Sequence, residues 1–157
     1  MAGEGQVLTQ EMRERAIGLE SAPATIDVEK GAVRRFAEAV GDPNPLWNDE
    51  AGADNSRFGG MIAPPTFLRS VKIERPELSL AFALSSRLDA GSDWEYFEPV
   101  RVGDRITGIA RIVDTWERSG KLGPMVFTLT EIKYTNQSGQ VVATQRAVSI
   151  LYSEKGS

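Results

Sequence analysis

The chain has 157 residues, with 18 basic and 22 acidic side chains and neither cysteine nor histidine. This length suits a single domain, and the mildly acidic balance gives no general attraction for nucleic-acid phosphates. Without cysteine there is no disulfide, thiolate nucleophile or iron–sulfur site. Without histidine the chain lacks the commonest metal ligand and the usual general base near neutral pH. The composition therefore excludes triad hydrolases and zinc enzymes, and we expect no metal site.

The sequence also argues against a membrane protein. No apolar run approaches the roughly 18–20 residues of a membrane span, and no basic stretch followed by an apolar one opens the chain. We therefore expect a cytoplasmic protein that has neither a membrane nor a nucleic acid as partner.

The first part of the chain predicts short helices around one strand. Residues 1–24 read as a tail, frayed over 1–8, with a short helix at 9–17 that Gly18 ends. Residues 25–28 alternate as a strand. In residues 30–40, apolar side chains recur at helical spacing and form one stripe, and Gly41 supplies the left-handed position that ends this helix.

Residues 41–66 are rich in turn-forming residues, and irregular stretches of this length inside a domain are usually functional. A short helix at 48–53 interrupts the segment. Pro64 and Pro65 then open a second helix, from 66 to about 73, because proline fits the first helical turn. This helix is apolar on most sides, so we expect it to be buried.

From residue 85 the hydrophobic period changes to two, which predicts strands at 86–89, 93–100, 105–117, 124–136 and 140–152. In the last strand, Val142, Thr144 and Arg146 share one face, whereas Ala143, Ala147 and Leu151 share the other. The predicted helices come first along the chain and an antiparallel meander of strands follows. This order indicates an α+β fold, with a long sheet wrapped around one largely apolar helix. Residues 153–157 are a polar tail.

Three segments resemble the MaoC-like family of (R)-specific enoyl-CoA hydratases and 3-hydroxyacyl dehydratases, which have the hotdog fold. They are Phe36-Ala37-Glu38-Ala39-Val40-Gly41-Asp42-Pro43-Asn44-Pro45-Leu46-Trp47, Gly60-Met61-Ile62-Ala63-Pro64-Pro65-Thr66-Phe67 and Pro99-Val100-Arg101-Val102-Gly103-Asp104. They occur in the family's order, and the similarity extends over residues 25–152. It is greatest to the branch called the MaoC N-terminal or FAS1-like dehydratase domain, which includes accessory subunits of hydroxyacyl dehydratases.

The resemblance implies a site and also shows that parts of it are missing. Catalytic members use an aspartate and a histidine five residues later to add or remove water, and a backbone amide at the start of the central helix to hold the enolate oxygen. Asp42 matches the aspartate and Asn44 the asparagine that follows it, but Trp47 occupies the histidine position, and indole is a donor only. At the helix start Pro64 and Pro65 have no N–H. Each missing part is worth a factor of about 10²–10⁴ in rate.

Each of these residues also has a structural interpretation. The sequence Asp-Pro-Asn-Pro is a helix-ending turn in its own right, so Asp42 is either a turn residue or a catalytic remnant. Trp47 either packs in the core or covers an acyl chain. Phe67 and Leu68 are expected in the core, although the resemblance places their helix beside the acyl tunnel. The candidate substrate-binding residues are therefore Asn44, Trp47, Pro65, Phe67 and Leu68.

Three functions remain open. In the first, the chain is the non-catalytic subunit of a heteromeric hydratase or dehydratase; its partner is a homologous hotdog chain in a heterodimer or tetramer, with a homodimer as the alternative. In the second, it is a stand-alone enzyme that uses Asp42, or another carboxylate among Asp89, Asp93 and Glu95. In the third, it binds acyl thioesters without chemistry. All three need no cofactor and take acyl-CoA or an acyl carrier thioester as ligand.

Overall fold

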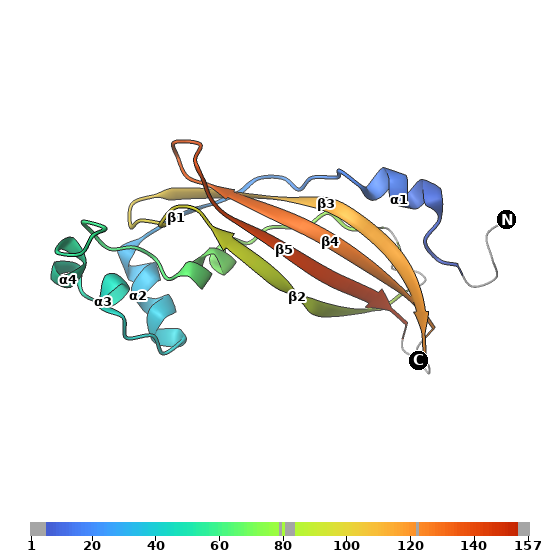
Figure 1. Ribbon diagram of the computed structural model, residues 1–157, viewed down its shortest axis with the longest axis horizontal. Helices are drawn as coiled ribbons and strands as arrows, with labels where there is room; N and C mark the ends of the chain where they lie inside the picture. The colour runs from blue at the N-terminus through green and yellow to red at the C-terminus, as the bar shows by residue number, and fades with distance from the viewer. Residues whose placement is uncertain (1–5, 79, 81–83, 122, 154–157) are drawn as a thin grey trace.

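The computed structural model describes residues 6–78, 80, 84–121 and 123–153, which form a curled sheet with helices at its two ends (Figure 1). The elements are α1 (Gln10–Ala16), β1 (Ala24–Asp27), α2 (Lys30–Ala39), α3 (Pro45–Asn48), α4 (Glu50–Asp54), η1 (Pro65–Ser70), β2 (Ser86–Tyr96), β3 (Arg105–Gly120), β4 (Gly123–Thr135) and β5 (Val141–Tyr152). The five strands are antiparallel, in the order β1-β3-β4-β5-β2. This arrangement confirms the predicted α+β class. Among the helices described, none is long and apolar enough to cross a membrane.

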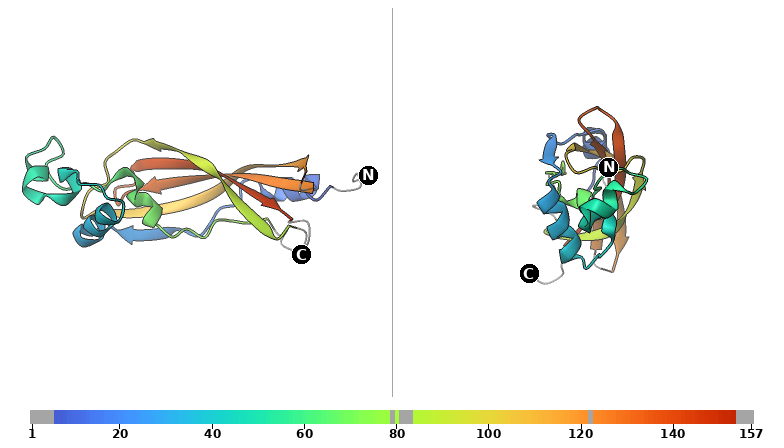
Figure 2. Two further views of the ribbon diagram at one scale, coloured as in Figure 1. Left: turned by 90° about the horizontal axis from the view of Figure 1, so that it is seen from below. Right: turned by 90° about the vertical axis from the view of Figure 1, so that its left-hand side faces the viewer.

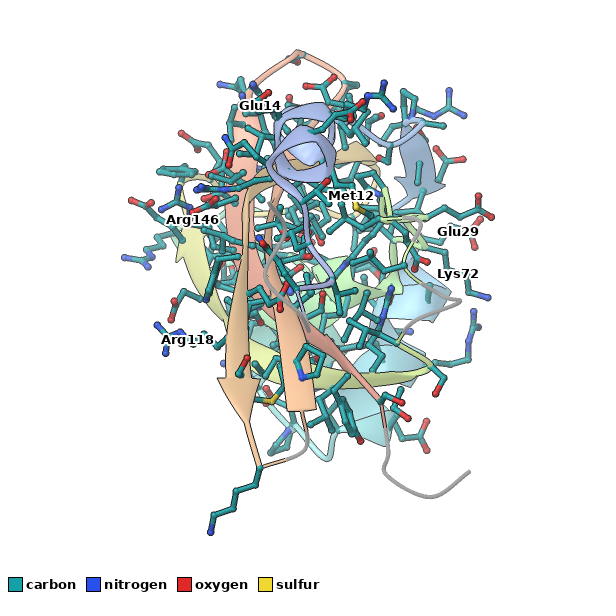
Figure 3. The ribbon with its side chains drawn as sticks, turned by 90° about the vertical axis from the view of Figure 1, so that its right-hand side faces the viewer. Met12, Glu14, Glu29, Lys72, Arg118 and Arg146 are labelled. Carbon is teal, nitrogen blue, oxygen red and sulfur yellow. The ribbon has the colours of Figure 1, made fainter. Side chains whose placement is uncertain are left out.

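The helices α2, α3 and α4 gather at one end of the sheet and α1 lies at the other (Figures 1 and 2). As predicted, α2 ends at a glycine in the left-handed region, since Gly41 has a φ of 69°. The hydroxyl of Thr9 accepts a hydrogen bond from the Met12 amide and caps α1. Viewed end-on, Met12 points from α1 toward the interior, whereas Glu14 lies on the outer side (Figure 3).

The predicted helix at 66–73 is wrong in type and length. The chain forms a 3₁₀ helix, η1, over Pro65–Ser70, and residues 72–78 have no regular secondary structure. The reason is local. Val71 is already extended, with a ψ of 111°, and Pro76 keeps a helix from resuming because it cannot donate a helical hydrogen bond and disfavours the helical conformation of Arg75 before it. The segment instead runs past one face of the sheet toward β2.

The two expected strands at 86–89 and 93–100 are one strand, β2, with a register shift between Asp89 and Ser92. It ends at Tyr96, so the prediction of strand at 97–100 is wrong. Val142 and Ala143, predicted on opposite faces of the last strand, are both fully buried. In β4 the buried side chains are Val126, Thr128, Thr130, Ile132 and Tyr134. We call the face that bears them the inner face. In β5 it carries Ala143, Ala147 and Leu151, one of the two predicted sets.

Two apolar clusters lie against the inner face. The larger one joins α2, η1 and the adjoining half of the sheet, and Phe36 meets Phe67 edge to face at 5.7 Å. The smaller one, at the α1 end, contains Leu8, Leu80, Leu84 and Val126. The expected frayed tail is therefore wrong for residues 7 and 8, whose amides donate to the Glu117 carboxylate at 2.9 and 2.7 Å. Residues 1–5 and 154–157 lie outside the described residues.

Candidate functional site

A pocket of about 340 Å³ opens where α3, η1 and the end of β2 meet. It brings together two of the residues singled out from the sequence, Trp47 and Pro65. Most of its remaining wall is apolar, from residues far apart in the chain: Phe58, Ile62, Ala63, Tyr96, Phe97, Pro99 and Val100, with Arg57 and Glu98 as the charged members. We call it the Trp47 pocket.

Backbone hydrogen bonds fix the shape of this pocket. The Ile62 amide donates to the Leu46 carbonyl at 3.2 Å, and the Ala63 amide donates to the Val100 carbonyl at 2.7 Å. These bonds tie the chain on either side of Trp47 to the approach of η1 and to the segment after β2. The pocket wall is therefore built on paired backbone rather than on a free loop.

The indole of Trp47 is buried and has an unused hydrogen-bond donor. Its side chain is 7% exposed, and its Nε1 has no hydrogen-bond partner among the described residues. A buried donor without a partner costs about 1–3 kcal/mol. The indole thus adds a buried, unpartnered donor to a wall that is otherwise mostly apolar.

Asp42 does not line the Trp47 pocket. Its carboxylate accepts the Asn44 amide at 3.1 Å, and it lines a separate, open cavity of about 440 Å³ together with Arg34, Glu38 and Asn48. The Asn48 side chain donates to the Asp42 carbonyl at 2.8 Å. These contacts are those of a turn that ends one helix and begins the next.

Asn44, Phe67 and Leu68 have structural contacts. The Asn44 side chain accepts the Leu46 amide at 3.0 Å and so caps α3. Phe67 and Leu68 are 3% and 1% exposed in the larger apolar cluster, and neither lines the Trp47 pocket. Of the predicted site residues, the structure thus brings only Trp47 and Pro65 into one pocket.

As the sequence predicted, the first positions of η1 lack a backbone amide hydrogen. Pro65 is the first residue of η1 and Pro64 precedes it, so neither position offers an amide hydrogen. The Pro64 carbonyl accepts the Phe67 amide at 2.9 Å.

The other candidate carboxylates lie on β2, outside this pocket. Trp94 and Tyr96 face inward, where Trp94 stacks on Tyr96 at 5.8 Å and on Tyr134 at 5.6 Å. Asp93 and Glu95 alternate with them and therefore face outward. Burial raises the pKa of Tyr96, and it raises the pKa of Tyr134 to about 12, against the opposing effect of Arg75 and Arg69.

Sequence reasoning missed the pocket's far wall, Phe58 and Phe97. Gly59, with a φ of 64°, reverses the chain after Phe58, and the Arg101 side chain donates to the Phe58 carbonyl. The glycine pair at 59 and 60 was the available signal for this turn, but its partner lies some 40 residues further along the chain, at Arg101.

Comparison with known proteins identifies the class to which this fold and site belong. The family model described as "FAS1-like, dehydratase domain region" matches residues 15–145. Over 143 residues the chain is 30% identical to a UPF0336 protein of Saccharopolyspora erythraea, covering 85% of this chain and 87% of that protein. Over 89 residues it is 39% identical to a UPF0336 protein of Streptomyces avermitilis, covering 52% of this chain and 57% of that protein. The chain thus spans little more than half the length of the Streptomyces relative.

Solved structures show the same fold. The ChsH1-ChsH2 complex from Mycobacterium tuberculosis superposes with a TM-score of 0.73 at 18% identity, over 94% of this chain and 90% of that chain. The HadBC (3R-hydroxyacyl-ACP dehydratase) complex from the same organism superposes with a TM-score of 0.68 at 21% identity. The match covers 86% of this chain and 96% of that chain. The molecule is a hotdog protein of the MaoC-like dehydratase and hydratase class. Within that class, the chain belongs to the FAS1-like dehydratase domain family.

Proposed function

We propose that this chain is the non-catalytic subunit of a heteromeric (R)-specific 2-enoyl-thioester hydratase or 3-hydroxyacyl dehydratase. Its Trp47 pocket accommodates the acyl thioester, and a homologous subunit that carries the aspartate and histidine performs the chemistry. The similar folds in the ChsH1-ChsH2 and HadBC complexes support pairing of this kind.

The identity of residue 47 carries the proposal. A hydratase must move a proton to or from C2 while water is added at C3, and this requires a group that both accepts and donates a proton near neutral pH. The indole of Trp47 donates a hydrogen bond and accepts none, so it holds an oxygen but moves no proton.

Two further observations support the same assignment. The Asp42 carboxylate accepts the Asn44 amide and lines a different cavity, so no carboxylate of that turn faces the Trp47 pocket. At the start of η1, Pro64 and Pro65 remove the amide hydrogens that would stabilise an enolate oxygen. The aspartate, histidine and amide positions of catalytic members therefore supply no proton-transfer group to this pocket, and Glu98 is the carboxylate that lines it.

The partner subunit has a natural place to dock. Among the residues that the structure describes, β2 pairs only with β5 and ends the sheet, so its outer backbone edge is open to another strand. Leu88, Tyr96 and Phe97, on and just after this strand, are 50%, 43% and 49% exposed. Pairing of two subunits along β2 covers these side chains and continues the sheet.

The test is reconstitution. The purified chain alone is expected not to hydrate C4–C16 trans-2-enoyl-CoA substrates, and co-expression with a histidine-bearing homologous subunit is expected to give hydration. Trp47→His in the isolated chain is expected to stay inactive, because the proline pair and the position of Asp42 are unchanged. Brisk turnover by the isolated wild-type chain that Asp42→Asn abolishes would overturn the proposal in favour of a stand-alone enzyme.

A binding module without any catalytic partner is the second candidate, favoured by the unpartnered indole N–H. It predicts that saturated acyl-CoA raises the melting temperature of the isolated chain and that Trp47→Phe, which keeps the ring but loses the donor, reduces the shift. A thioether analogue that lacks the carbonyl separates the two contributions, since Trp47→Phe should leave its smaller shift unchanged. Binding without activity in every tested pairing would favour this function over the first.

A further inference from the structure

Four polar side chains form a row across the inner face, one on each of four adjacent strands. Asp89 of β2 lies opposite Ser149 of β5, Ser149 opposite Thr128 of β4, and Thr128 opposite Thr115 of β3. Residues paired in this way share a face of the sheet. We call these four residues the polar row.

The polar row separates the two apolar clusters. On the η1 side, Ile132 and Ala110 belong to the larger cluster, and on the α1 side Val126 belongs to the smaller one. Thr115 is fully buried and Thr128 is 8% exposed. A buried hydroxyl is costly unless it is hydrogen-bonded, and the Thr115 and Thr128 hydroxyls lie 3.5 Å apart, within hydrogen-bond distance.

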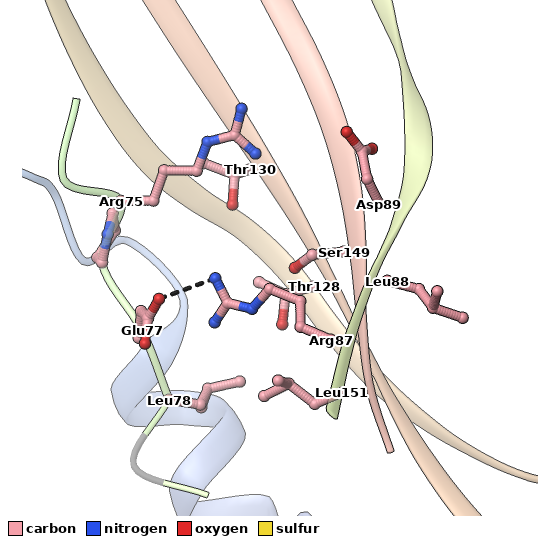
Figure 4. A pocket seen from close by; sticks show the side chains of 11 residues that line it. Arg75, Glu77, Leu78, Arg87, Leu88, Asp89, Thr128, Thr130, Ser149 and Leu151 are labelled. Carbon is pink, nitrogen blue, oxygen red and sulfur yellow. Dashed lines mark ion pairs between the residues drawn. The ribbon is translucent and has the colours of Figure 1, made fainter. Parts of the chain in front are cut away.

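A cavity of about 320 Å³ opens over the polar row, and the segment after η1 forms its opposite wall (Figure 4). Thr128, Thr130 and Ser149 face it from the sheet, and Arg75 and Glu77 face it from the segment (Figure 4). At one side Glu77 forms an ion pair with Arg87 at 2.8 Å (Figure 4).

The hydrogen-bonding groups of this cavity are incompletely used. The Thr115 hydroxyl donates to the Phe127 carbonyl at 2.9 Å. The hydroxyls of Thr130 and Ser149 make no hydrogen bond to any other residue that the structure describes, and Arg75 forms no ion pair there. Thr130 is 4% exposed and Arg75 is half-buried. Each of these unused groups can donate a hydrogen bond, and all three line the cavity.

The charges around the cavity favour a neutral acceptor. Glu77 neutralises Arg87, and Asp89 accepts the Gly91 amide at 2.9 Å but keeps its negative charge. The lining therefore carries two cationic and two anionic side chains, and a further carboxylate gains little net attraction.

A row of stacked aromatic rings lies between this cavity and the Trp47 pocket on the inner face. Tyr96 lines the Trp47 pocket, and Trp94 stacks on both Tyr96 and Tyr134. Tyr134 lines a small space of about 90 Å³ whose wall also includes Arg75. Arg75 in turn lines the cavity over the polar row. An acyl chain held at Trp47 that follows these rings along the inner face would bring its far portion to these donors.

We propose that the cavity over the polar row binds an oxygen atom on the acyl chain, far from the thioester, so that the substrate carries a hydroxyl or keto group rather than a plain hydrocarbon tail. Arg75 and Thr130 donate to that oxygen. The inference rests on the proposed function, since it assigns the acyl group that the Trp47 pocket accommodates.

The experiment measures binding of dodecanoyl-CoA and of a series of hydroxydodecanoyl-CoAs, with the hydroxyl at C6 to C12, by calorimetry on the purified chain. At least one hydroxylated thioester is expected to bind about tenfold more tightly than dodecanoyl-CoA, the gain of a hydrogen bond to a charged donor. Arg75→Met and Thr130→Val should each reduce this preference, measured as the ratio of the two affinities in the same variant.

Lys72→Met is the matched control, because Lys72 lies on the same segment but points outward (Figure 3). It should leave the preference intact. Equal binding of plain and hydroxylated thioesters by the wild type would overturn this inference alone. Tightest binding of dodecanedioyl-CoA would overturn it in favour of an anion site. Failure of all thioesters to bind would overturn the acyl-binding role, and the inference with it.

Discussion

Trp47 and Tyr134 are two buried aromatic residues that each carry a hydrogen-bond donor. Trp47 brings a donor that no described residue accepts, whereas the Tyr134 hydroxyl donates to Gln145 Oε1 at 3.2 Å. One donor is without a partner among the described residues, and the other is hydrogen-bonded within the fold. The difference follows from position, since Tyr134 faces a polar side chain of the neighbouring strand and Trp47 faces a mostly apolar pocket.

Tyr134 gives a pH prediction. Burial raises its pKa to about 12, above the value near 10 of an unfolded tyrosine, so the folded protein favours the neutral phenol. The stability that this contributes is complete below about pH 10 and is lost as the pH rises toward 12. Absorbance titration at about 295 nm should find one phenol that ionises late, absent in Tyr134→Phe.

The melting temperature of the wild type should also fall more steeply between about pH 10 and pH 12 than that of Tyr134→Phe. The variant itself should be less stable at neutral pH by about 1 kcal/mol, because it lacks the hydrogen bond to Gln145. Identical alkaline loss in both proteins would contradict the assignment.

Among the elements, η1 and the segment after it take the place of the central helix that the sequence predicted. Pro64 and Pro65 stand at the start of η1, which ends at Ser70, and the chain continues across the inner face in an irregular conformation that includes Pro76. This segment then supplies Arg75 and Glu77 to the polar cavity. A continuous helix would place its side chains on a period of 3.6 and could not line the cavity in the same way.

The packing of this segment on β3 can be tested at Gly108. A Cβ added there would lie 2.5 Å from Ile73 Cδ1 and 3.3 Å from Tyr134 Cδ1. Gly108→Ala is therefore expected to reduce the free energy of unfolding by about 1–3 kcal/mol, as overpacking does. Urea denaturation measures the change.

Gly60→Ala is the control for this substitution, since an added Cβ meets nothing within 4 Å at that position. It should change the stability little. Equal effects of the two substitutions would show that the segment does not pack on Gly108 as described.

At the scale of the whole molecule, the described sheet has one long edge strand, β2, and the proposed pairing of subunits uses it. β2 has 11 residues, compared with 4 in β1 at the opposite edge. The longer strand also carries the half-exposed Leu88. It offers a partner both unpaired backbone and apolar surface.

Leu88→Lys is expected to weaken association with the partner subunit about tenfold or more, because a buried leucine contact is worth about 1.5–3 kcal/mol. Analytical ultracentrifugation of the co-expressed pair measures this. Val40→Lys, at the end of α2 and 56% exposed, is the matched control and should leave assembly unchanged. If both variants assemble like the wild type, β2 is not the docking edge.

The elements that the sequence predicted well are those with a local cause. The stripe of α2 and the glycine after it define that helix, and the alternation of β5 shows in advance which residues share a face. The sequence predicted only in part which of the candidate site residues lie together. Trp47 and Pro65 meet in one pocket, but Asp42 turns toward Asn44 and lines another. Spacing along the chain does not reveal which way a turn directs its carboxylate.

The sequence by itself determined what this protein lacks: no histidine or cysteine anywhere, a donor-only indole at position 47, and prolines where a helix would offer an amide. These are properties of residue types and need no coordinates. Only the tertiary structure decided that Asp89, Ser149, Thr128 and Thr115 lie in one row, and that Arg75 faces a cavity over it. Strand register and the course of an irregular segment depend on contacts between residues far apart in the chain, and local patterns do not encode those contacts.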